Sequence, residues 1–67
     1  MTDTLADALP REMKRVRELI PIYGKVPNGA FAIAMMNEAL SRAEKSMVED
    51  DVLRMIAAYA ELKGFSE

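Results

Sequence analysis

The 67-residue sequence contains no cysteine, no histidine and no tryptophan. Without cysteine, the chain forms no disulfide and offers no thiolate to a metal ion. Without histidine, it lacks the commonest side-chain metal ligand and the usual general base of enzymes. Its serines therefore have no imidazole to activate them as nucleophiles. We expect a protein that is not an enzyme and that holds neither a metal ion nor a cofactor.

Long apolar runs and a strong net charge are also missing. The longest uncharged stretch, residues 26–37, includes a proline and a glycine and is too short to span a bilayer. The first residues are acidic and lack the basic region with which a signal peptide begins. We therefore expect a cytoplasmic protein without a membrane partner. The net charge of −2 argues against general affinity for nucleic acid.

Hydrophobic residues make up 51% of the sequence, which is too many for a disordered chain, and they recur at helical spacing. The pattern predicts an all-α fold: a compact three-helix arrangement built on an antiparallel αα-hairpin. The expected helices cover about residues 10–23, 29–46 and 50–63. Residues 1–9 are expected to form a flexible N-terminus, and residues 10–65 a single helical domain. Whether the first helix ends or kinks at Pro21 is left open.

Each expected helix carries an apolar stripe that should face the core. The stripe of the first helix is Leu9, Met13, Val16, Ile20 and Tyr23. The stripe of the second helix is Ala32, Ile33, Met36, Ala39, Leu40, Ala43 and Met47. The stripe of the third helix is Val52, Leu53, Ile56, Tyr59 and Ala60.

Residues with special backbone roles punctuate these helices. Gly24 fits a left-handed cap at the end of the first helix, and Asn28 is placed to cap the second. Three adjacent acids, Glu49, Asp50 and Asp51, stand where a helix N-terminus offers unpaired N–H groups. Because three consecutive acids cannot all point at one ion, helix capping explains them better than a cation site does.

Several apolar residues remain after these stripes are assigned to the core. Phe31 and Met35 lie one helical turn apart, away from the stripe of the second helix, and Met55 and Leu62 lie at the edge of the third. Either the first helix covers them within one chain, or they form a contact surface of a homodimer, which we favour. The residues expected to bind a protein partner are Phe31, Met35, Arg42, Met55, Tyr59 and Leu62.

Two other functions stay open. In one, a dimer binds nucleic acid through basic residues of the first helix, namely Arg11, Lys14, Arg15 and Arg17. The same residues are interleaved with acids, so they are more readily interpreted as the solvated face of a helix. In the other, the chain is a structural component of a larger assembly.

Four segments of the chain also resemble a family of natural proteins. Residues 17–23 (RELIPIY), 26–31 (VPNGAF), 43–47 (AEKSM) and 55–63 (MIAAYAELK) are similar to short uncharacterised helical proteins encoded by bacteriophages and prophages. That family carries no established active site. The resemblance implies a small accessory protein, a class in which some members regulate or inhibit a host protein by binding to it.

Overall fold

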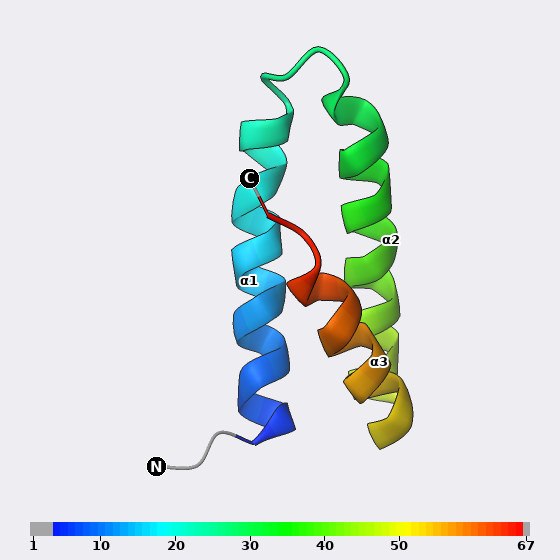
Figure 1. The fold of residues 1–67 in the computed structure, drawn as a ribbon. Coiled ribbons are helices and arrows are strands. Elements are labelled where there is room, and N and C mark those ends of the chain that lie inside the picture. The colour runs from blue at the N-terminus through cyan, green and yellow to red at the C-terminus, as the bar shows by residue number, and fades with distance from the viewer. Residues whose placement is uncertain (1–3, 67) are drawn as a thin grey trace.

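Three helices form the protein, as the sequence predicts. The computed structural model describes residues 4–66, which fold into α1 (Leu5–Tyr23), α2 (Gly29–Val48) and α3 (Val52–Lys63). Helices α1 and α2 lie side by side and antiparallel, and α3 returns obliquely from the far end of α2 to pack against both (Figure 1). The all-α, three-helix arrangement is thus confirmed, with α2 and α3 as its hairpin.

Helix α1 begins five residues earlier than expected. The Thr4 hydroxyl caps it by accepting a hydrogen bond from the N–H of Asp7 at 3.3 Å. Leu9 is fully buried, and Leu5 packs against the core. Residues 5–9 therefore belong to the helical domain, not to a flexible arm, whereas residues 1–3 of that expected arm lie outside the described residues.

The same helix continues through Pro21 to Tyr23. Gly24 then ends it with φ −63°, so the expected left-handed cap is wrong; the N–H of Gly24 instead donates to the carbonyl of Ile20 at 3.0 Å. Asn28 precedes α2, but its side chain makes no capping hydrogen bond, contrary to expectation. Pro21 has no N–H to donate to the carbonyl of Arg17, so the last turn of α1 lacks one helical hydrogen bond.

Gly29 brings the two long helices together at the loop end. A Cβ atom on Gly29 would lie 1.8 Å from the carbonyl oxygen of Tyr23, which is far inside van der Waals contact. Gly29 is itself buried. The close approach of α2 to the end of α1 therefore requires glycine at this position.

A tight acidic turn joins α2 to α3. Asp50 adopts a left-handed conformation (φ 53°), which aspartate tolerates better than most residues. The N–H of Asp51 donates to the carbonyl of Ser46 at 3.0 Å, and the Asp51 carboxylate accepts from the N–H of Arg54 at 3.1 Å. Asp51 therefore caps α3, as expected for the acidic trio, and the helix begins at Val52.

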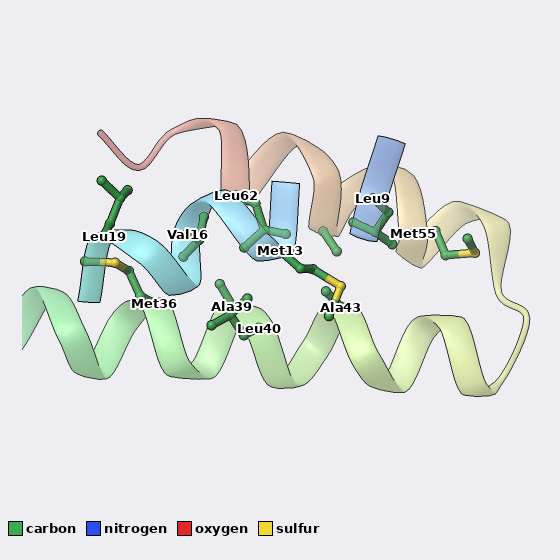
Figure 2. Packing of buried hydrophobic residues seen from close by; sticks show 11 residues of the cluster. Leu9, Met13, Val16, Leu19, Met36, Ala39, Leu40, Ala43, Met55 and Leu62 are labelled. Carbon is green, nitrogen blue, oxygen red and sulfur yellow. The ribbon is translucent and has the colours of Figure 1, made fainter. Parts of the chain in front are cut away.

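The core lies where the three helices meet (Figure 2). The expected stripes of α1 and α2 supply most of it, although Met47 is exposed and Ile20, Tyr23, Ala32 and Ile33 are only partly buried. Leu19, which the expected stripe leaves out, is buried as well. The buried hydrophobic residues are Leu9, Met13, Val16, Leu19, Met36, Ala39, Leu40, Ala43, Met55, Ala58 and Leu62.

Helix α3 turns a different face inward from the one that the sequence suggests. Val52, Leu53 and Ile56, expected in the core, are 56%, 80% and 52% exposed. Met55 and Leu62, expected at a partner surface, are 8% and 0% exposed, so that part of the site prediction is wrong. The helix is apolar on two sides, and its polar neighbours make contacts, described below, that fit the observed orientation.

Candidate protein-interaction surfaces

Phe31 and Met35 form an exposed apolar pair near the start of α2. Their side chains are 75% and 46% exposed, and the spacing of four residues places them on one face of the helix. Arg42 follows Met35 by seven residues, two helical turns further along the same face. The structure therefore brings together these three of the six residues expected to bind a partner.

Helix α3 does not reach Phe31 and Met35. Its last turn lies beside Arg42, which is closer to the C-terminal end of α2. The guanidinium of Arg42 donates to both carboxylate oxygens of Glu61, with Nη2–Oε2 at 2.6 Å and Nε–Oε1 at 3.2 Å. This bidentate ion pair sets the C-terminal turn of α3 beside Arg42. Met35 and Phe31 lie two and three turns beyond that point.

After Lys63 the chain turns toward α1 instead of continuing along α2. Arg15 of α1 donates from Nη1 to the carbonyl of Phe65 and from Nη2 to the carbonyl of Leu62, both at 2.8 Å. The Tyr23 hydroxyl donates to the carbonyl of Ser66. The C-terminal tail accordingly crosses to α1 in Figure 1. Within residues 4–66, this path leaves the face of α2 that carries Phe31 and Met35 uncovered.

A cleft of about 380 Å³ opens between α2 and α3 next to Arg42. Its apolar floor includes Ala57 and Ala58, together with the buried Ser46, whose hydroxyl donates to the carbonyl of Ala43 at 2.7 Å. Three cations and one acid line the rest of the cleft: Arg42, Lys45, Arg54 and Glu61. Although the chain as a whole is acidic, the cleft rim is basic.

Two of the rim cations already have carboxylate neighbours. The Glu61 carboxylate, first through its hydrogen bond and then through its charge, raises the pKa of Arg42 above the ordinary value. Arg54 lies with its Nε 3.3 Å from Oδ2 of Asp51. Both pairs are solvent-exposed, and neither uses all five N–H donors of its guanidinium.

Tyr59 lies apart from the Phe31 pair. Its ring is partly buried against the core, and the ammonium of Lys63 lies 5.3 Å from the ring centroid. Tyr59 is thus mainly a packing residue of α3, in line with its place in the predicted core stripe.

A second apolar surface runs along the outer side of α3, and sequence reasoning missed it. Its five members are exposed and share one side of the helix, away from the core: Val52, Leu53, Ile56, Ala57 and Ala60. The helical spacing of Val52, Leu53, Ile56 and Ala60 was visible in the sequence, but it led to their assignment to the core, and Ala57 was assigned to neither face. We refer to these five residues as the outer stripe.

The basic residues of α1 are largely engaged within the chain. Arg15 holds the two carbonyls described above and also donates from Nε to Glu12 at 3.1 Å, and Arg17 pairs with Glu44 at 2.8 Å. Arg11 has an interaction of its own, and Lys14 is exposed. Arg15 and Arg17 thus each contact another segment of the chain, while Arg11, Lys14 and Arg17 remain exposed.

Other kinds of site find little support within residues 4–66. No three acidic side chains there come close enough together to hold a metal ion, and none of the three described helices combines the length and apolarity needed to cross a membrane. Comparison of the chain with protein-family models, curated proteins and solved structures finds no match.

Proposed function

We propose that this chain is a non-enzymatic interaction protein that binds an amphipathic helix of another protein along the exposed face of α2. The observation that carries the proposal is the 75% exposure of Phe31, an aromatic side chain that adjoins Met35 and lies on the same helix face as the cleft rim. Aromatic and methionine side chains are the usual apolar anchors when a helix docks into a groove.

The dimensions of this face suit a short helix. From Phe31 to Lys45, α2 advances by about 21 Å at 1.5 Å per residue. A partner helix of about four turns would match that length, with apolar residues at helical spacing over Phe31 and Met35. Covering these two side chains would contribute about 2–4 kcal/mol, given their exposed fractions.

The charge of the rim indicates the chemistry of the partner. Arg42, Lys45 and Arg54 outnumber Glu61 at the cleft, so an acidic segment is attracted there and a basic segment is repelled. We therefore propose a partner helix with apolar residues at one end and acidic residues at the other. Exposed ion pairs of this kind affect the association rate and partner choice more than the affinity.

The biological role that fits this chemistry is inhibition of a partner protein by covering its binding helix. A small helical protein that covers an acidic amphipathic helix prevents that helix from reaching its own target. This is how the phage-encoded accessory proteins that the sequence resembles would regulate or inhibit a host protein.

A synthetic peptide tests the proposal. We would label a helical peptide with a leucine stripe and glutamates on its flanks, and measure its binding to the chain by fluorescence anisotropy. A matched peptide with lysines in place of the glutamates serves as the control. We expect the acidic peptide to bind at least about tenfold more tightly, and the preference to shrink with added salt. Equal binding of both peptides would contradict the acidic-partner proposal.

A pair of variants locates the binding surface. Phe31→Glu should lower the affinity for the acidic peptide by at least about tenfold, because it removes an apolar anchor and adds a repelling charge. Lys14→Glu changes the charge more but lies on α1, and it should lower the affinity less. Circular dichroism should report unchanged helix content for both variants, since both positions are exposed. A loss of helicity in Phe31→Glu would instead assign Phe31 a role in folding.

A further inference from the structure

The outer stripe of α3 is apolar along its whole length. Val52, Leu53 and Ile56 are more than half exposed, and Ala57 and Ala60 continue the stripe toward the C-terminal end of the helix. Ala57 forms the edge of the stripe next to the cleft between α2 and α3. Within residues 4–66, neither of the other two helices covers the remaining four residues. Contiguous apolar patches on a protein surface are often interaction sites.

The central residues of the stripe have the spacing of a helix–helix seam. Leu53, Ile56 and Ala60 recur after three and four residues, the spacing that lets side chains of two helices interdigitate. The large side chains lie in the N-terminal half of the stripe, and the alanines lie in the C-terminal half. If two copies of α3 pack in antiparallel orientation, Ile56 lies next to the partner's Ile56 at the twofold axis, and Leu53 lies against the partner's Ala60.

Charge at the two ends of α3 favours the same orientation. The exposed acids Glu49 and Asp50 precede the helix, and the exposed Lys63 ends it. An antiparallel pair brings the acids of each copy next to the partner's Lys63, whereas a parallel pair brings like charges together. The two helix dipoles also attract each other when the helices are antiparallel.

We propose that the outer stripe binds a second copy of this chain, as a twofold antiparallel α3–α3 dimer. From Val52 to Ala60 the stripe is only about 12 Å long, so the contact is smaller than the roughly 800 Å² per partner of a stable interface. The dimer is therefore weak and forms with rising concentration. It leaves Phe31 and Met35 uncovered, so a dimer carries two of the α2 faces and gains avidity for a multivalent partner.

Sedimentation equilibrium tests the dimer with the intact chain alone. Between about 5 and 500 µM, we expect the mass to rise from 7.5 kDa toward twice that value. Ile56→Glu should keep the mass at 7.5 kDa because it places two like charges together at the twofold axis. Leu53→Glu should do the same because it sets a charge against the partner's apolar Ala60. Phe31→Glu, on the other surface, should leave the association unchanged. A monomer at every concentration, or an association that both seam variants leave intact, would overturn the proposal.

Cysteine cross-linking tests the orientation, since the natural sequence has no cysteine. Under mild oxidation, Ile56→Cys should form a disulfide-linked dimer. A mixture of Leu53→Cys and Ala60→Cys chains should cross-link to each other faster than either does to itself. Efficient self-cross-linking of Leu53→Cys would indicate parallel helices and overturn the antiparallel arrangement. None of these results depends on peptide binding to α2, so the two proposals succeed or fail separately.

Discussion

Leu62 is fully buried, while Leu53 on the same helix is 80% exposed. The two residues are nine positions apart, which at 100° per residue places them on opposite sides of α3. Leu62→Ala should therefore lower the free energy of unfolding by about 2–5 kcal/mol, through lost burial and the cavity left behind. Leu53→Ala should change it by less than about 0.5 kcal/mol. Urea denaturation at low micromolar concentration compares the two variants, and equal effects would contradict the orientation of α3.

Arg15 joins the end of α3 and the tail to α1 through the carbonyls of Leu62 and Phe65. Because charge-assisted hydrogen bonds are the stronger class, Arg15→Ala should lower the free energy of unfolding by about 1–3 kcal/mol. Arg15→Lys should recover only part of that loss, since an ammonium cannot reproduce the fork of the guanidinium. Lys14→Ala, one position away and exposed, is the matched control and should be nearly neutral. If Arg15→Ala is neutral as well, the hydrogen bonds from Arg15 to the carbonyls of Leu62 and Phe65 contribute nothing to stability.

Gly29 packs its backbone against the carbonyl of Tyr23 too closely for any side chain. We expect Gly29→Ala to force the α1–α2 loop apart and to lower the free energy of unfolding by about 1–3 kcal/mol. In Gly24→Ala the new Cβ would lie 3.4 Å from the carbonyl oxygen of Pro21, an ordinary contact, and φ is −63°. That control should be neutral or stabilising by up to about 1 kcal/mol. Thermal unfolding distinguishes the two glycines, and a harmless Gly29→Ala would contradict the close approach.

The effect of Arg42→Gln measures how the ion pair with Glu61 depends on pH and on salt concentration. The pKa of Arg42 is raised by Glu61, so the contribution of its positive charge is fully present below the ordinary arginine pKa and is lost only in strongly alkaline solution. Raising the pH from 7 to 9 should therefore leave the effect of Arg42→Gln unchanged. Because the pair is exposed, added salt should reduce that effect. A marked change in the effect of Arg42→Gln between pH 7 and pH 9 would contradict this account.

The fold class and the course of the chain follow from patterns visible in the sequence. Apolar residues three and four apart define each helix, and the short connections at residues 24–28 and 49–51 make successive helices antiparallel. The N-terminal boundary was missed because Pro10 suits the first helical position, whereas the actual cap is Thr4. Its hydroxyl accepts from the N–H of Asp7 at 3.3 Å and donates to the Asp7 carboxylate at 2.9 Å. Propensity alone does not decide between two such candidate starts.

The inward face of α3 could not be read from spacing. The more strongly apolar side of α3 is formed by Val52, Leu53 and Ile56. The side that faces the core is nevertheless formed by Met55, Ala58 and Leu62. Partners distant in sequence accompany this orientation: Arg42 binds Glu61, and Arg15 binds the carbonyl of Leu62. The small Ala58 also lets α3 approach its neighbours closely. Phe31 and Met35, in contrast, were correctly expected outside the stripe of α2, because their helix has one clear apolar side.

Because α3 packs against only part of α2, we expect local opening of the backbone to differ between the two ends of the molecule. The loop at residues 24–28 lies beside the ends of α1 and α2 alone, whereas the other end of α2 also packs against α3 (Figure 1). We expect hydrogen exchange to be fastest at the loop end and to slow toward the acidic turn. A ligand seated over Phe31 would supply the missing third neighbour and retard exchange at the loop end. Deuterium uptake would thus reveal occupancy of that end before the ligand itself was known.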